Sequence, residues 1–378
     1  MRGFLDGSTA RRVSGWALDE QGNPPLLQVW VNGQTVYEFV PAALRPDLPS
    51  ACAFDVDIGR VLQNGDTLGV TSRDGQQHLG GSPARVTGQP VTRMDKAFWL
   101  ARRDMKILEI GPSFGPLAPR SAGWNCYSLD CATAEELRIK YADQPTVSSI
   151  EEVDFVWRNG SLADAVPADQ HGTFDYVLAS HVFEHAPDPI GFLHSIAKLL
   201  RAEGLLCLAL PDKRRMFDFF RQITVTSDWL VAIGQTRHSP KAHFDNAAYP
   251  VTECGQIIWP ARAMGSNWSF MNTLEVAKAG FDRTLSQQGS GDYVDLHATV
   301  STPASFELIL LEVGQLGLLP FHIVKTFPGA IEFEYWLTLQ KGAPERLPDD
   351  ELRRQRLRLM NQSLREQAEA ARWLLDEA

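Results

Sequence analysis

Between Lys106 and Lys341 the sequence alternates short, almost wholly apolar runs with segments of helical periodicity, and this alternation constrains the fold most strongly. Runs that are apolar throughout are typical of strands buried on both faces, and helices between them predict a mostly parallel sheet. Two helical segments, 133–142 and 188–204, lie between such runs; the second begins on Asp188-Pro189 and stops at Gly204. The expected strands are 106–110, 125–130, 153–157, 174–180, 205–211, 321–327 and 331–340.

The last two expected strands are too close in sequence for a helical crossover, so they should pair antiparallel. The sequence therefore predicts an α/β fold, a seven-stranded doubly wound sheet with a reversed last strand. A long segment, about 212–303, precedes the sixth strand and contains helical patterns and many aromatic residues. Because a long insertion inside a compact domain is usually functional, we expect this segment to form a substrate cap.

Residues 1–88 have a different character, because short alternating runs follow one another between Gly, Asp and Pro residues. Asn32-Gly33 separates two of these runs, and Asn-Gly readily adopts the positive φ angles of a tight hairpin turn. We expect a small all-β sandwich here, followed by a second domain over 89–345. Residues 346–378 have apolar positions three and four apart, which predicts an amphipathic helix that packs on its own domain or on a sister subunit.

The overall composition excludes several classes of function. A formal net charge of −10 argues against general nucleic-acid binding, which normally needs a basic excess. The first residues lack the apolar core of a signal peptide, and no later apolar run is long enough to span a membrane, so we expect a cytoplasmic protein. The five cysteines form no Cys-x-x-Cys pair, which predicts reduced thiols and no cysteine-based zinc site.

The stretch KILEIGPSFGPL, residues 106–117, ends the first expected strand with an acid and a turn that contains two glycines. Glu109 stands in the strand, and Gly111 and Gly115 have no Cβ, so a ligand could approach the backbone closely. Asp130 ends the next expected strand, and the carboxyl ends of neighbouring strands lie side by side in a doubly wound sheet. Its carboxylate could accept hydrogen bonds from two ribose hydroxyls. Together these features predict a nucleotide cofactor.

The segment from Phe174 to Arg214 resembles the central part of class I S-adenosylmethionine-dependent methyltransferases, and residues 106–117 resemble their first motif. The resemblance implies S-adenosylmethionine as the cofactor. It also implies the binding residues: Glu109, Gly111, Ser113 and Gly115 beside the methionine part, Asp130 at the ribose, Asn159 near the adenine, and Ser180 and His181 on the sulfonium side. A NAD-dependent enzyme is the rival, but its turn normally reads Gly-x-Gly-x-x-Gly and supports a pyrophosphate.

Two positions depart from the usual pattern of this family. Ser113 stands where the commoner motif has its middle Gly, which a serine can replace if its φ is negative. At the adenine position the family often has an acid, whereas this chain has Arg158 and Asn159, so Asn159 is the better hydrogen-bonding candidate.

Methyl transfer to a hydroxyl needs a base, and imidazole is the natural base near neutral pH. The catalytic candidates are His181 and His185 after the fourth expected strand and His243 in the cap, with His238 and His297 as further candidates. His181, Glu184 and His185 also have helix-face spacing, and some methyltransferases similar in this motif bind a divalent ion through Glu-x-x-Glu-His and a later His. Because His181 replaces the first Glu of that pattern, we expect a helix cap and a base rather than a metal.

The residues Asp212, Lys213 and Arg214 follow the fifth expected strand, at the carboxyl edge where open sheets bind substrates. A basic cluster there suits a phosphate or an acidic sugar. Methyltransferases similar in this segment tend to accompany bacterial surface polysaccharide synthesis, and VSGWALD and ALRPDLP resemble a β-rich module found beside bacterial glycosyltransferases. The sequence thus predicts methyl transfer to a sugar or glycan hydroxyl. The alternative is a catalytically silent binding module in a glycan-assembly complex; in either case the partners would be a homodimer mate or glycan-assembly enzymes.

Overall fold

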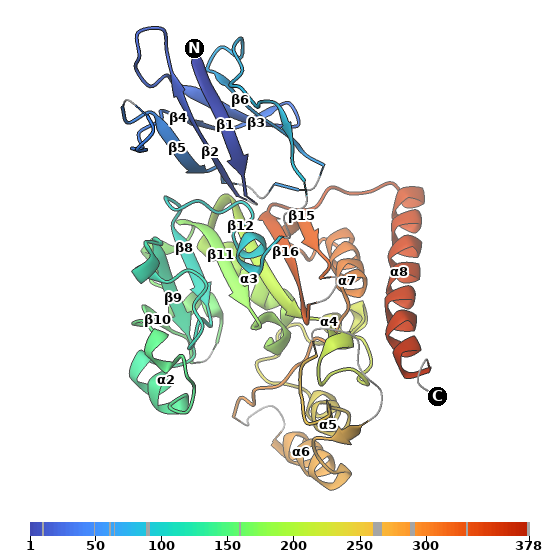
Figure 1. Cartoon of the computed structure of the whole chain (residues 1–378). Helices are drawn as coiled ribbons and strands as arrows, with labels where there is room; N and C mark the ends of the chain where they lie inside the picture. The colour runs from blue at the N-terminus through green and yellow to red at the C-terminus, as the bar shows by residue number, and fades with distance from the viewer. Residues whose placement is uncertain are drawn as a thin grey trace. The chain divides into compact units, whose positions relative to one another are not determined.

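The computed structural model describes residues 1–9, 11–48, 50–59, 62–63, 65–87, 91–158, 160–259, 267–287, 292–329 and 332–375. Contacts divide the chain into two compact units, Met1–Asp104 and Met105–Ala378. The largest sheet, of seven strands, belongs to the second unit (Figure 1).

The first unit contains two antiparallel sheets whose apolar side chains form one core. The expected hairpin is present: Asn32 and Gly33 have φ angles of 51° and 81°, as a tight turn of this kind requires. A short helix, α1 (Arg93–Ala97), is capped by Thr92. One sheet has the strand order β1 (Arg2–Ser8), β2 (Arg12–Leu18), β5 (Ala53–Asp57). The other has the order β4 (Gln34–Phe39), β3 (Leu27–Val31), β6 (Thr67–Ser72), β7 (Ala84–Arg85).

The second unit is built on a mixed seven-stranded sheet with the order β10-β9-β8-β11-β12-β16-β15. Neighbours from β10 to β12 are parallel, and β16 is antiparallel to both β12 and β15, so the expected reversed strand is confirmed. The strands are β8 (Ile107–Ile110), β9 (Cys126–Asp130), β10 (Phe155–Val156), β11 (Phe174–Ser180), β12 (Leu200–Pro211), β15 (Phe321–Phe327) and β16 (Glu334–Lys341). This is the Rossmann-like methyltransferase arrangement, in which the order reverses between β8 and β11.

Two helices, α3 (Pro189–Leu199) and α7 (Pro303–Gln315), pack their apolar faces into one core with the central strands. Asp188 caps α3 by accepting a hydrogen bond from Gly191 N, and Pro189 occupies the first turn, as expected. The helix ends at Leu199 rather than at Gly204, because Leu200 already pairs with Phe174 in the sheet and the chain continues as β12. Between β9 and β10 lies α2 (Ala134–Lys140), whereas the β8–β9 connection contains only the 3₁₀ turn η1 (Arg120–Ala122).

The expected cap between β12 and α7 contains several short elements, and α5 and α6 pack on each other beyond one end of the sheet (Figure 1). Its elements among the described residues are η6 (Lys213–Arg215), α4 (Thr226–Val231), α5 (Pro240–Ala248), β13 (Val251–Glu253), β14 (Trp268–Phe270) and α6 (Leu274–Gln287). Aromatic residues of this region form a small core together with Val251 and Ala370: Phe219 and Trp268 stack with ring centroids 5.3 Å apart.

The C-terminal helix α8 (Asp349–Leu375) packs on α7 of the same chain. Glu312 Oε1 lies 2.7 Å from Arg356 Nε, and Glu366 accepts a hydrogen bond from Ala304 N. Leu357 and Leu364 remain exposed on the other face of this helix. Among the described residues, no helix combines the length and the apolar character that crossing a membrane requires.

Candidate functional site

The turn after β8 adopts backbone conformations that favour glycine. Gly111 has a φ of 64°, and a Cβ built on it would lie 2.7 Å from Val182 Cγ2, so both conformation and packing require Gly here. Ser113 has a φ of 47°, which corrects the expectation that a serine at this position keeps a negative φ. The contact between Gly111 and Val182 also brings the turn beside the segment that follows β11.

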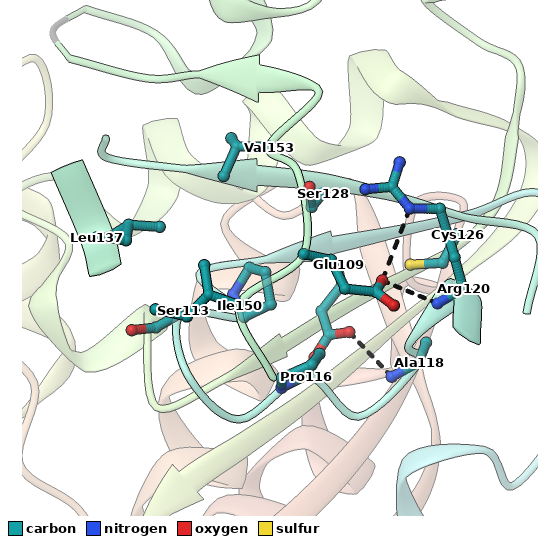
Figure 2. A pocket seen from close by; sticks show the side chains of 12 residues that line it. Glu109, Ser113, Pro116, Ala118, Arg120, Cys126, Ser128, Leu137, Ile150 and Val153 are labelled. Atoms are coloured by element: carbon teal, nitrogen blue, oxygen red, sulfur yellow. Dashed lines mark hydrogen bonds and ion pairs between the residues drawn. The ribbon is translucent and has the colours of Figure 1, made fainter. Parts of the chain in front are cut away.

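Glu109 holds the end of the loop that follows this turn. Its two carboxylate oxygens accept hydrogen bonds from Leu117 N at 2.8 Å and Ala118 N at 3.0 Å, and the residue is buried. Figure 2 shows Glu109 joined to Ala118 by one of these bonds, beside a small pocket. A carboxylate that is already paired with backbone N–H groups shapes the loop, and this explains why an acid stands in an otherwise apolar strand.

Asp130 holds the turn itself, at Ser113. Its Oδ2 accepts from Ser113 N at 3.0 Å and its Oδ1 from Cys131 N at 2.7 Å. Because a carboxylate oxygen can accept more than one hydrogen bond, both oxygens keep capacity for a ligand. The hydroxyl of Ser113 is buried and has no hydrogen-bond partner among the described residues, so a polar group is left for a ligand. The turn therefore fits a nucleoside cofactor.

Gly115 and Ser180 are two further cofactor candidates. A Cβ at Gly115 would meet open space, and Ser180 is the last residue of β11. Arg158 forms an exposed ion pair with Glu136 at 2.7 Å. Asn159 lies outside the described residues. The cofactor assignments of individual residues stay predictions.

A second group of side chains surrounds Glu184 in the 3₁₀ turn η5 (Phe183–His185), directly after β11. Glu184 is fully buried, and its Oε1 lies 3.5 Å from His181 Nδ1, 3.8 Å from His185 Nε2 and 4.0 Å from His297 Nε2. We call Glu184, His181, His185 and His297 the histidine cluster. It brings together two of the predicted catalytic residues, His181 and His185.

Each imidazole of the cluster has a second carboxylate beside it. His181 Nε2 lies 2.8 Å from Glu334 Oε2, and His185 Nδ1 lies 2.8 Å from Asp295 Oδ1. His297 Nδ1 lies 2.5 Å from Asp218 Oδ2. These three acids were not found from the sequence; only Asp295, two residues before His297, stands near a histidine in the chain.

The electrostatics of the cluster follow from these pairs. Burial lowers the pKa of His181, but Glu184 and Glu334 outweigh it and raise this pKa to about 9. Burial raises the pKa of Glu184, yet the three imidazoles bring it below its ordinary value. Burial likewise lowers the pKa of His185, and Asp295 and Glu184 more than compensate. The cluster thus pairs buried positive and negative charges.

The third catalytic candidate, His243, lies on α5 outside this cluster. Its ring centroid is 6.3 Å from that of His238, and burial and Arg283 lower its pKa. Burial lowers the pKa of His238 to about 4. Both histidines are therefore neutral at physiological pH, and neither has one of the carboxylate partners that orient the cluster.

The predicted substrate residues after β12 are turned into the protein. Asp212, Lys213 and Arg214 are buried; Arg214 Nη2 donates to Asp212 Oδ2 at 2.5 Å, and Lys213 Nζ donates to the carbonyl oxygen of Phe219 at 2.6 Å. The basic groups thus have partners inside the chain, and their role in substrate binding stays a prediction.

A large pocket is lined by the segment that follows His185 and by the cap, which includes the segment after His297. Ala186 and Pro187 contribute from the first segment, and Ala298, Thr299 and Val300 from the second. The cap supplies both apolar side chains, among them Ile223, Trp229, Val231 and Leu285, and polar ones, which include Arg221, Gln222, Thr224, Asp228, Gln235, Thr236, Arg237, His238, Ser239, Lys241 and Asp245.

Residues 87–263 match a family model described as a methyltransferase domain. The chain contains a class I S-adenosylmethionine-dependent methyltransferase domain. The matched residues include the turn after β8, Asp130 and the η5 turn. The family match therefore agrees with S-adenosylmethionine as the cofactor of the turn after β8.

Curated relatives of this methyltransferase domain are named ubiquinone biosynthesis O-methyltransferases. The protein from Xanthomonas campestris pv. campestris (strain B100) is 32% identical over 104 residues, 28% of this chain and 42% of the relative. That from Caulobacter vibrioides is 30% identical over 128 residues, 33% of this chain and 49% of the relative. The chain thus spans less than half the length of the curated relatives it matches.

Solved structures with similar folds include a SAM-dependent methyltransferase from Aquifex aeolicus and a putative one from Listeria monocytogenes. The first is 11% identical with a TM-score of 0.30, over 63% of this chain and 82% of that one. The second is 11% identical with a TM-score of 0.31, over 63% and 92%. At scores this low, the assignment of the methyltransferase domain rests on the family model and the strand order.

Proposed function

We propose that the protein transfers a methyl group from S-adenosylmethionine to a hydroxyl oxygen of its acceptor. The observation that carries the proposal is the contact of Gly111 with Val182, because it puts a turn suited to the cofactor beside the histidine cluster. S-adenosylmethionine supplies an electrophilic methyl group on a positively charged sulfur. The new oxygen–carbon bond forms as the sulfur–carbon bond breaks, the electron pair stays on sulfur, and the hydroxyl proton passes to a base.

The chain's own residues would contribute alignment, exclusion of water and a proton acceptor. Glu109 and Asp130 hold the turn from both sides through backbone N–H groups, so the cofactor would meet a preformed loop. His181 and His185 are the histidines nearer to this loop. Because its pKa is raised to about 9, His181 would accept a proton only in alkaline solution, which leaves His185 as the nearer candidate for the proton acceptor. His243 would reach the reaction only from the cap.

For the acceptor we propose a sugar or glycan precursor. The pocket beside the cluster supports this choice, because its cap side is lined by many hydrogen-bonding side chains, which suit a molecule with several hydroxyls. The curated relatives are named O-methyltransferases, which supports oxygen as the atom methylated. Because those relatives are named for ubiquinone biosynthesis, a phenolic acceptor is the competing outcome of the test.

The first test is calorimetric titration of the full chain with S-adenosylhomocysteine, with Asp130→Ala and the matched control Asp143→Ala, an exposed acid after α2. We expect the wild type and the control to bind and Asp130→Ala to lose most of the affinity, since it removes both the ribose partner and an anchor of the turn. Absence of binding to the wild type would overturn the cofactor proposal.

The second test is transfer of labelled methyl groups to two acceptor panels, nucleotide sugars with glycan fragments and simple catechols. Labelled sugar products support the proposed acceptor, and labelled catechols would replace it with a phenol. If S-adenosylhomocysteine binds but neither panel is methylated by the wild type, the alternative of a catalytically silent module is favoured.

A further inference from the structure

We propose that Tyr293 covers the adenosine part of bound S-adenosylmethionine and completes the cofactor site. This inference rests on the proposed function, because it needs the turn after β8 to hold this cofactor. Tyr293 belongs to an irregular segment, residues 292–296, that we call the strap. The strap lies outside residues 87–263, so the match to the methyltransferase family assigns it no role.

On one side, the strap is held to the segment that follows β11. Asp295 Oδ1 lies 2.8 Å from His185 Nδ1, and the hydroxyl of Tyr293 donates a hydrogen bond to the carbonyl oxygen of His185 at 3.3 Å. The same segment contains Val182, which lies against Gly111 of the turn after β8. Two side chains of the strap thus bind the segment that borders the cofactor turn.

On its other side, the strap comes close to the segment that follows β9. A hydrogen bond with His185 lowers the pKa of Asp295 most, and the ammonium group of Lys140 on α2 contributes, so that this pKa falls to about 2. Burial raises the pKa of Tyr293, and the charges of Asp295 and Cys131 raise it further. Because such interactions weaken with distance, Cys131 and Lys140 must lie near the strap.

The strand order shows what lies beneath the strap. In the sheet, β8 stands between β9 and β11, and Cys131 directly follows β9 whereas His185 follows β11. A segment that reaches from Cys131 to His185 therefore crosses the carboxyl end of β8, where open α/β sheets bind their ligands. Cys131 is also the neighbour of Asp130, the predicted ribose residue, so the crossing lies on the adenosine side of the site.

Tyr293 presents a large aromatic surface at this place. Tyr293 and the neighbouring Val294 are each 44% exposed. Adenine has two flat faces, and stacking on an aromatic side chain is a common way in which proteins bind such a base. The ring centroid of Tyr293 also lies 5.5 Å from that of His238, which lines the large pocket. Tyr293 would therefore separate the cofactor from the acceptor pocket as well as cover it.

The first measurement is the calorimetric affinity of the full chain and its variants for S-adenosylhomocysteine. We expect Tyr293→Ala to weaken binding about 10–100-fold, the effect of losing a stacked aromatic ring. Tyr293→Phe keeps the ring and loses only the hydrogen bond to His185, so its affinity should stay within about threefold of the wild type. The matched control is Tyr249→Ala, because Tyr249 is 41% exposed and stands at the end of α5; it should bind like the wild type. Equal affinity of Tyr293→Ala and the wild type would overturn the proposal.

The second measurement is hydroxyl-radical footprinting of the wild type, which does not depend on how a variant folds. We expect S-adenosylhomocysteine to reduce the labelling of Tyr293 and to leave that of Tyr249 unchanged. If the wild type binds S-adenosylhomocysteine and Asp130→Ala does not, but Tyr293 is labelled equally with and without it, the cover is wrong and the proposed function stands. If the wild type does not bind S-adenosylhomocysteine, the proposed function and the cover both fall.

Discussion

The turn after β8 and the histidine cluster after β11 lie side by side but are built in opposite ways. The turn is local: it connects two consecutive strands, and Glu109 and Asp130 on those strands hold it by accepting hydrogen bonds from backbone N–H groups. The cluster is assembled from distant segments, and its contacts join charged side chains. A short sequence motif predicts a site of the first kind, whereas a site of the second kind depends on the whole fold.

The largest effect should follow from removing a buried charge that is paired with the cluster. Asp218 is paired with His297 and, at 2.8 Å, with Arg221. Breaking a buried ion pair from one side typically costs about 3–5 kcal/mol, so we expect Asp218→Ala to lower the free energy of urea-induced unfolding by that amount. The control is Asp282→Ala, which breaks an exposed pair with Lys278. Losses of similar size in both variants would show that the cluster is not a buried network.

An intermediate effect is expected at the turn, where the chain offers its own matched pair. Gly111→Ala must place a Cβ at positive φ and against Val182, so we expect a stability loss of at least about 1–2 kcal/mol and loss of S-adenosylhomocysteine binding. Gly115→Ala adds a Cβ in open space and should leave stability unchanged. Thermal unfolding and calorimetry measure the two quantities. Equal stability of both variants would contradict the strained turn.

The difference between the two regions also explains what could be predicted from the sequence. Strand order and the Gly turn follow from periodicity and short motifs, because their contacts are local or repeat along the chain. The partners of His297 do not: Asp218 lies in an irregular segment, and only the folded chain shows that it meets His297. The positive φ of Ser113 was not predicted either. It goes with a hydrogen bond from Ser113 N to Asp130 on the neighbouring strand, which the short motif does not contain.

The pH dependence of stability tests whether Lys213, in the segment after β12, is buried or exposed. Burial lowers the pKa of Lys213 to about 8, against 10.5 for the ordinary side chain. Between pH 8 and 10.5 the unfolded chain still binds the proton that the folded chain has lost, so stability should rise with pH over this interval. We expect Lys213→Met to remove this rise in urea titrations. An unchanged pH slope would indicate an exposed Lys213, as a substrate-binding role at the surface would require.

The smallest effect is expected at the exposed edge of the sheet, beyond the turn. Arg158 and Glu136 form an ion pair in which both side chains are about half exposed, and such pairs contribute about 0–1 kcal/mol. Arg158→Ala should therefore change stability by less than about 0.5 kcal/mol. The guanidinium of Arg158 already donates a hydrogen bond to Glu136. If it does not also contact the adenine, Arg158→Ala should change the affinity for S-adenosylhomocysteine less than about twofold. A tenfold loss of affinity with unchanged stability would instead make Arg158 part of the binding site and extend the local, motif-encoded region from the turn to the end of β10.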